Sequence, residues 1–557
     1  MDCGVSLLIG LLWFCYTLYL FIEPSFFRPS KSSVGTLSET ALLDALVAVF
    51  VLLHAPASLL SSFISSAWGP RRSTSDRSST WFTSVMLSHA RKSLRGWIVF
   101  PFDHNSGKLA VLCPVLAQYR LSLLYPVRIA YPSWPFLSIS PTSNYKRLHD
   151  SFATTCHNFR SFMSSLPLHL RKLCKLPNKS SFATYAYAEP KHKDDSLFRP
   201  IVSYYNHPFK RLLNYCSRAL LLILTLACAT HWSLFNETLL PSLLSASFQD
   251  IRSLYGENTS FLLFSADIKN MFTCLPHPDI IEAVQWLILR FKSITSKSGV
   301  WVWAQSSSLH KDDPSAIFLS LELILSICSF DIYHAIFFFG PVLLLQILGI
   351  PMGSPLSPQL AIITCAYAEH KWSIAHLVWS SHLASVRFVD DLGIILAYKS
   401  SSQRSFNVAI NILRSIVNNC YPAGLLLKFT LSSRELTLMR CTFSVSGDRV
   451  LQYSYVNKNQ HLSSTVPFSQ TFTRYRHFFS FFPVHKMSNT ASATLMSIVM
   501  FSSSTDSAYT SSLELFAELR HLMYPWNLLR SIVHRQHHAD PSPIWTRLLH
   551  FCQHSSR

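Results

Sequence analysis

Arg387-Phe388-Val389-Asp390-Asp391 is the stretch that decides how the rest of the chain folds. Its strand-forming residues end in two adjacent carboxylates, and the apolar run 392–396 follows directly. A strand, a tight turn and a second strand place both aspartates at the tip of a β-hairpin. Two charges at a hairpin tip are by themselves no more than a solvated turn, so their meaning depends on what lies upstream.

A third carboxylate, Asp267, ends the apolar run 261–266, which has the length of a strand. Pro278 follows and can open a helix. The first turn of this helix would contain acidic side chains and its last turn basic ones, which is the order that the helix dipole favours. We therefore predict a strand that ends at Asp267 and a helix that begins near Pro278.

Between the two acidic sites lies the segment 349–358, which is rich in proline and glycine. We predict that Ser357 caps a helix here and that Pro358 is the first helical residue. Three other segments have predicted structures: a buried helix over 219–229, an exposed insertion over 295–314, and a core helix followed by a strand within 317–350.

Asp267, Asp390 and Asp391 would repel one another strongly if folding brought them together. Divalent cations make such a cluster tolerable. Mg²⁺ prefers few carboxylates plus substrate phosphates, so the cluster indicates nucleotide chemistry. Two ions about 3.5–4 Å apart can activate a 3′-hydroxyl and stabilise a leaving pyrophosphate.

The order D-x-x-x-x-F, G-x-P-x-G-S-x-x-S-P and F-V-D-D resembles motifs A, B and C of reverse transcriptases. Met352 stands where most of these enzymes carry glutamine. Together with Thr273 and Pro276, it makes the chain most similar to Penelope-like retroelement reverse transcriptases that lack an endonuclease. The resemblance covers roughly residues 95–490 and implies an α+β right-hand polymerase with fingers, a palm whose antiparallel sheet is flanked by helices, and a helical thumb.

This resemblance implies an RNA-directed DNA polymerase, encoded by a retroelement, that adds deoxynucleotides to a primer 3′-hydroxyl on an RNA template. Asp267, Asp390 and Asp391 would be the catalytic ligands of two Mg²⁺ ions, with Mn²⁺ as an alternative. Lys428 lies in 424–430, which is similar to motif D, and would be the general acid for pyrophosphate; a surface lysine explains this position equally well.

The remaining implied site residues bind nucleotide or nucleic acid. The segments 189–193 and 199–203 resemble the family's basic motif before the palm, and Arg199 offers a planar fork for triphosphate oxygens. Phe272 would exclude a ribose 2′-hydroxyl, although a core aromatic is the ordinary interpretation in a chain with 40 Phe. The resemblance assigns nucleotide binding to Arg199, Lys193, Lys191, Phe272, Gly353 and Ser354, and nucleic-acid binding to Arg474 and Arg476.

Composition and the resemblance together predict that the chain has four parts. These are 1–80, a hydrophobic N-terminal extension with a Ser/Arg linker; 81–250, an N-terminal region and fingers; 251–460, the palm with motifs A to D; and 461–557, the thumb and C-terminal region. The sequence shows no GIY-YIG endonuclease signature and no acidic cluster typical of RNase H. His534, His537 and His538 lack a metal-ligand spacing and are interpreted as solvated.

Composition agrees with a polyanionic partner. The 557 residues contain 48 Lys+Arg against 29 Asp+Glu, a net charge of +19, which is typical of nucleic-acid binding. A mean hydropathy of +0.24 and the uncharged run 5–22 keep a membrane-associated protein as an alternative that we do not favour. Thirteen scattered cysteines without C-x-x-C indicate reduced thiols, which are typical of an intracellular protein. A reverse transcriptase of this kind is expected to act in the nucleus.

Two alternatives stay open. One is a polymerase of the group II intron or telomerase type, which Met352 disfavours. The other is a catalytically decayed nucleic-acid-binding protein, suggested by His104 and Arg440, which stand where the family carries lysine and an acid. The intact aspartates argue against decay.

Overall fold

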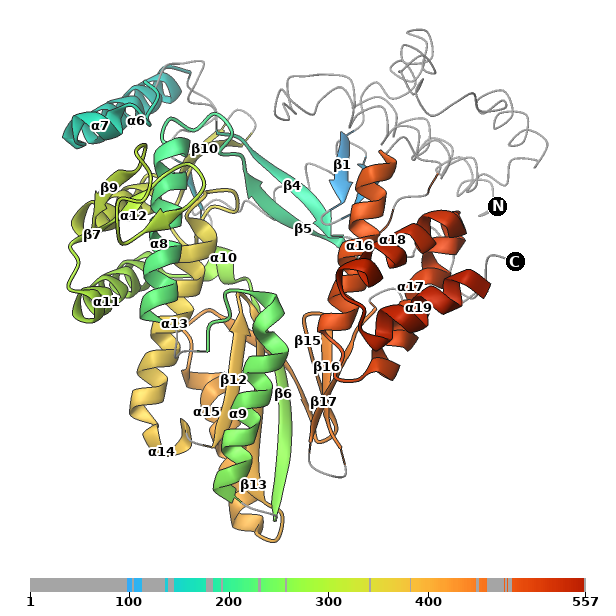
Figure 1. The fold of residues 1–557 in the computed structure, drawn as a ribbon. Coiled ribbons are helices and arrows are strands. Elements are labelled where there is room, and N and C mark those ends of the chain that lie inside the picture. Colours follow the sequence, from blue (N-terminus) through green and yellow to red (C-terminus); the bar gives the residue numbers. More distant parts are fainter. Residues whose placement is uncertain are drawn as a thin grey trace, which may run out of the picture.

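The chain folds into a mixture of helices and sheets, shown in Figure 1. The sequence predictions for residues 1–97 and for His104 lie outside the part of the chain that the structure describes. The computed structural model describes residues 98–102, 105–112, 136–138, 145–176, 184–191, 194–228, 232–255, 258–339, 342–380, 382–446, 450–457, 475, 478 and 483–554.

A four-stranded antiparallel sheet contains both acidic motifs. Its order is β12-β13-β6-β14, so β6 lies between the hairpin and a strand that follows much later. The strands are β6 (Thr259–Lys269), β12 (Leu383–Phe388), β13 (Asp391–Lys399) and β14 (Leu426–Ser432). The predicted hairpin and the predicted antiparallel sheet are both confirmed, and β6 extends two residues beyond Asp267.

Both faces of β6 and β13 are covered, which explains why these strands are continuous apolar runs rather than alternating ones. Phe261 and Leu263 share one cluster with Phe248 of helix α9 (Leu240–Tyr255), on one face of the sheet. Phe264 shares a different cluster with Ile412 of α15 (Gln403–Asn419), on the opposite face. These two strands are therefore packed from both sides, whereas the edge strand β14 is largely exposed.

Four helices pack together in one apolar cluster with the end of β6 and the loop before α13. The prediction for 219–229 is confirmed, because α8 has Leu220, Ile223 and Leu224 fully buried. Helix α11 begins at His277, with Asp279 in its first turn and Lys292 in its last. The group comprises α8 (Lys210–Ala227), α11 (His277–Thr295), α12 (Leu321–Tyr333) and α13 (Ser357–Ala375).

Two sequence predictions in this region are wrong. Ser357 is not the cap of α13 but its first residue, and its hydroxyl donates to the Pro351 carbonyl at 2.6 Å instead. The segment 295–314 is not simply an exposed insertion, because β7 (Gly299–Val302) pairs on one side with β8 (Ser307–Ser308) and on the other with β9 (Ile317–Ser320). Burial of Val300 against the helices outweighs the polar composition of its neighbours.

Smaller sheets and two helices lie N-terminal to the central sheet. They are β1 (Ile98–Phe102), β2 (Asn105–Leu112), β3 (Phe136–Ser138), α6 (Tyr145–Ser165), α7 (Leu168–Arg171), β4 (Ala186–Lys191) and β5 (Asp194–Val202). Short elements join the larger ones: η1 (Glu237–Leu239), α10 (Met271–Cys274), β10 (Ile336–Phe339), β11 (Val342–Gln346) and α14 (Leu377–Ser380). The helix and strand predicted within 317–350 correspond to α12 and to β10 and β11.

The C-terminal part combines a small sheet with four helices, which lie on the right in Figure 1, opposite α8, α11 and α12. One apolar cluster joins these helices to α9 and to one face of the central sheet. The elements are β15 (Glu435–Leu438), β16 (Cys441–Val445), β17 (Leu451–Tyr455), α16 (Val484–Met500), α17 (Thr505–His521), α18 (Trp526–Ala539) and α19 (Pro543–His554).

Within the described ranges, no helix is long and apolar enough to cross a membrane. The ten cysteines that the structure describes are all free thiols. Burial raises the pKa of several of them, including Cys174, whose thiol reaches about 12.

Candidate active site

The acidic residues of the two motifs meet because β6 and β13 are neighbours. Asp391 stands directly opposite Asp267, and Lys428 stands opposite Asp267 on the other side, from β14. Directly paired residues of an antiparallel sheet project from the same face, with Cβ atoms about 4.5–5.5 Å apart. The structure therefore places Asp391, Asp267 and Lys428 in one row across three strands.

Asp390 lies at the turn of the hairpin, beside this row. Phe388 pairs with Asp391, so Val389 and Asp390 form the two-residue turn. The Ile268 N–H of β6 donates to the Asp390 carbonyl at 2.9 Å. This bond fastens the hairpin tip to the strand that carries Asp267.

An unpredicted residue, Lys269, belongs to the same site. Its ammonium forms an ion pair with Asp267 Oδ2, and the two side chains are 43% and 38% exposed. Residues two apart in a strand share a face, so the sequence contained this signal, although no role was assigned to Lys269. Because two carboxylates directly opposite one another repel, the ammonium supplies the positive charge that the pair requires.

Arg199 of β5 acts electrostatically on Asp390, at the turn beside the acidic row. Burial raises the pKa of Asp390, and the nearby carboxylate of Asp267 raises it further, while Arg199 and Lys269 act in the opposite direction. Two segments 191 positions apart in sequence thus supply opposite charges to one place.

The oxygen donors of this row fit a divalent cation. Among the residues that the structure describes, no group of three or more His, Cys, Asp or Glu side chains is arranged to hold a metal ion by itself. Mg²⁺, however, is usually bound by one or two carboxylates plus substrate phosphates. The Asp267–Asp391 pair satisfies that smaller requirement, and Lys269 shows that a cation is already attracted to Asp267. Convergence of all three carboxylates on shared ions stays a prediction.

The loop before α13 is packed against β5, the strand of Arg199. The Val202 N–H donates to the Met352 carbonyl at 2.9 Å. Gly353 has φ +141°, and a Cβ added there would lie 2.0 Å from the Val202 carbonyl oxygen. Only glycine allows this approach of two backbones. Gly353 therefore positions the loop against the strand, a role that requires no side chain.

Ser354 is buried and does not face solvent. Its hydroxyl donates to Asp331 Oδ2 of α12 at 2.7 Å, and Asp331 also interacts electrostatically with Tyr204, in the segment after β5. Burial raises the pKa of Asp331 to about 6. Within the described part of the chain, Asp331 Oδ1 has no hydrogen-bond partner. Ser354 thus joins the loop to α12 and to the segment after β5, a connection that the sequence did not reveal.

The other predicted residues are placed as follows. Phe272 is half-buried at the start of α10, and its carbonyl accepts from the Ile350 N–H at 2.6 Å. This bond joins the segment after Asp267 to the loop before α13. Lys191 ends β4, but its side chain is outside the description, and Lys193, Arg474 and Arg476 lie outside the described residues.

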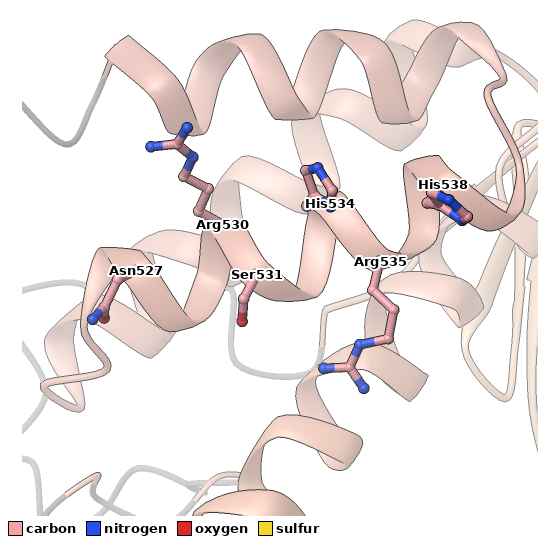
Figure 2. A pocket seen from close by; sticks show the side chains of 6 residues that line it. All are labelled: Asn527, Arg530, Ser531, His534, Arg535 and His538. Carbon is pink, nitrogen blue, oxygen red and sulfur yellow. The ribbon is translucent and has the colours of Figure 1, made fainter.

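A basic groove lies on α18, as Figure 2 shows. Its lining residues recur every three or four positions along one face of the helix, and all of them are at least partly exposed. The opposite face is apolar and buried through Leu529, Ile532 and Val533. The groove is lined by Asn527, Arg530, Ser531, His534, Arg535 and His538. The prediction that three histidines are solvated is confirmed for His534 and His538, whereas His537 is only partly exposed and contacts the Thr546 hydroxyl at 3.2 Å. The prediction did not include the two arginines on the same face as His534 and His538.

No protein-family model matches the chain, and no curated protein matches its sequence. Solved structures are similar in fold at low identity. Telomerase from Candida tropicalis in complex with a TWJ fragment of telomeric RNA is 13% identical, with a TM-score of 0.49 over 90% of this chain and 72% of its own. Telomerase from Candida albicans in complex with the same kind of fragment is 15% identical, with a TM-score of 0.43 over 84% and 75%. The BmCPV RNA-dependent RNA polymerase at elongation state is 13% identical, with a TM-score of 0.30 over 78% and 39%.

Proposed function

We propose that this protein is a template-directed nucleic-acid polymerase, and specifically an RNA-directed DNA polymerase encoded by a retroelement and acting in the nucleus. The observation that carries the proposal is the row formed by Asp391, Asp267 and Lys428, with Asp390 at the adjoining turn. Two carboxylates that face each other, with a lysine on the neighbouring strand, are suited to binding metal-bound phosphates. In this proposal the central sheet is the palm of a right-hand polymerase.

Each side chain of the row has a role in the proposed reaction. Asp267, Asp390 and Asp391 would hold Mg²⁺, which when bound lowers the barrier for attack of a 3′-hydroxyl on a triphosphate. Arg199 binds triphosphate oxygens, since a guanidinium offers paired donors. Lys428 donates a proton toward the leaving pyrophosphate, because its strand position directs it to the face of Asp267.

The groove on α18 is a candidate contact for the template or primer backbone. Arg530 and Arg535 form no ion pair with a described carboxylate, although Arg535 contacts the Ser488 hydroxyl at 3.4 Å. Exposed guanidinium groups at helical spacing can each contact a phosphate. The chain's net charge of +19 agrees with this use.

The test is primer extension with purified protein on an oligo-dT-primed poly-rA template, with Mg²⁺ and dNTPs. The wild type should extend the primer, whereas Asp390→Asn should not, since the substitution removes charge with little change in shape. Template binding should persist in the variant. A wild type that binds the template but extends nothing would instead support the decayed, nucleic-acid-binding alternative.

We also propose that the source of the primer is a pre-existing 3′ end, because the proposed reaction needs a 3′-hydroxyl to extend. Incubation with supercoiled plasmid and, separately, with a recessed-end duplex tests this. We expect extension from the recessed end alone. Nicking of the closed circle by the purified protein would contradict the proposal.

A further inference from the structure

A buried ion pair lies beneath the hairpin that carries Asp390. Arg387 of β12 and Glu369 of α13 are both fully buried. The Arg387 guanidinium donates to both carboxylate oxygens of Glu369, through Nε to Oε1 and through Nη2 to Oε2 at 3.3 Å. Nη2 also donates to Ser233 Oγ at 2.9 Å and the Ile362 carbonyl at 3.3 Å. Two opposite charges, both fully removed from solvent, therefore lie at the base of the proposed active site.

One further bond connects this pair to the turn. Arg387 Nη1 donates to the Val389 carbonyl at 2.8 Å. Val389 has φ +55°, a conformation that is a genuine outlier for a β-branched residue. Strain of this kind persists only where the surroundings impose it. The guanidinium holds the peptide that joins Val389 to Asp390, and so it fixes the position of the Asp390 backbone.

A structural purpose alone does not account for such a pair. Desolvation of two charges is costly, and apolar side chains of similar volume often stabilise a fold as well as a buried ion pair does. Glu369 is itself fixed, because the Tyr421 hydroxyl donates to Oε1 at 2.9 Å. The carboxylate therefore has a defined orientation, which it passes on to the guanidinium.

We propose that Arg387 is a positioning residue that holds the hairpin turn so that Asp390 and Asp391 face Asp267, with Glu369 orienting its guanidinium. The inference rests on the proposed function, since it assigns the turn to metal binding. Residues that orient metal ligands without touching the metal typically change metal affinity or activity by about 10- to 100-fold when removed.

The experiment separates positioning from packing by using a double variant. Arg387→Met alone leaves Glu369 buried and unpaired, so we expect a large loss of stability. Arg387→Met combined with Glu369→Leu removes both charges and refills the space, so its thermal unfolding midpoint should return toward that of the wild type. The Val389 carbonyl nevertheless lacks its donor in this protein.

Three quantities are measured on each protein: the unfolding midpoint, Mn²⁺ affinity by electron paramagnetic resonance without substrate, and the Mg²⁺ dependence of primer extension. The folded double variant should bind Mn²⁺ about 10- to 100-fold more weakly than the wild type. Leu244→Ala in α9 is the control, because it removes core packing on the face of the sheet opposite to Arg387. It should lower the midpoint without changing Mn²⁺ affinity.

A folded double variant with wild-type Mn²⁺ affinity and Mg²⁺ dependence would overturn the inference. If that variant does not fold, Tyr421→Phe decides, since it removes one bond to Glu369 and leaves the ion pair in place. We expect a smaller rise in the Mg²⁺ requirement, and an unchanged value in folded Tyr421→Phe would then count against positioning. A wild type that binds Mn²⁺ but extends nothing refutes only the polymerase, while Mn²⁺ affinity in the variants still tests Arg387.

Discussion

Replacing Gly353 by alanine should damage the fold more than a glycine substitution ordinarily does. The new Cβ would lie 2.0 Å from the Val202 carbonyl oxygen, and φ is +141°. The atom that it meets belongs to the backbone of β5, so no side chain can rotate away. The loop would have to move, and the hydrogen bond from the Val202 N–H to the Met352 carbonyl would break.

The expected cost can be worked out from these interactions. Backbone strain at such a φ costs about 1–3 kcal/mol, and overpacking costs about 1–3 kcal/mol. The broken hydrogen bond adds about 0.5–1.5 kcal/mol. Reduced freedom of the unfolded chain returns about 0.4–1 kcal/mol. The total loss of stability is therefore roughly 2–7 kcal/mol, a large part of the roughly 5–15 kcal/mol that stabilises a typical domain.

Gly424→Ala is the matched control. It also requires a positive φ, of +99°, but its Cβ would lie at an ordinary distance of 3.7 Å from the Cys274 carbonyl oxygen. Of the three costs only the backbone strain, about 1–3 kcal/mol, applies here. Reduced freedom of the unfolded chain again returns about 0.4–1 kcal/mol, so we expect a loss between about 0 and 2.6 kcal/mol. Urea unfolding followed by circular dichroism measures both variants. Equal losses for Gly353→Ala and Gly424→Ala would refute the reasoning from the close approach.

Three other outcomes are expected. Phe272→Ala should raise the ratio of ribonucleotide to deoxynucleotide incorporation more than it lowers dNTP turnover; an unchanged ratio in primer extension would count against a steric role beneath the sugar. Arg530→Gln with Arg535→Gln should reduce the slope of log nucleic-acid affinity against log salt concentration by about 0.7–0.9 for each phosphate that is no longer neutralised. Arg414→Gln, at an exposed position of α15, is the control and should leave this slope unchanged. Burial raises the pKa of Asp331 from 3.8 to about 6, so the folded state binds more protons, and wild-type stability should fall as pH rises through that interval. The fall should amount to about 3 kcal/mol relative to Asp331→Asn, and parallel pH profiles from urea titrations would contradict it.

Local patterns of the sequence were enough to predict several elements. The hairpin at Asp390 and Asp391 follows from two strand-forming runs around a two-residue turn, which are neighbours in sequence. Helix α11 begins within one residue of Pro278, because a proline and the order of charges act within a few turns. The cap of α13 was placed one residue late, since Ser357 bonds to the Pro351 carbonyl, an interaction made by the folded loop.

Only the tertiary structure decided which segments meet. A strand pattern shows which side chains share a face, but it does not name the neighbouring strand, so Lys428 beside Asp267 depended on β14 joining the edge of β6. Burial of Val300 within 295–314 depended likewise on the helices that cover it. Arg387 stood in the first stretch that we analysed, yet its partner Glu369 lies 18 positions earlier on another element. The sequence by itself determined the motifs, their order and the local turns, because those depend on neighbouring residues; the interactions that would hold the motifs together form between distant segments, and only folding brings these into reach.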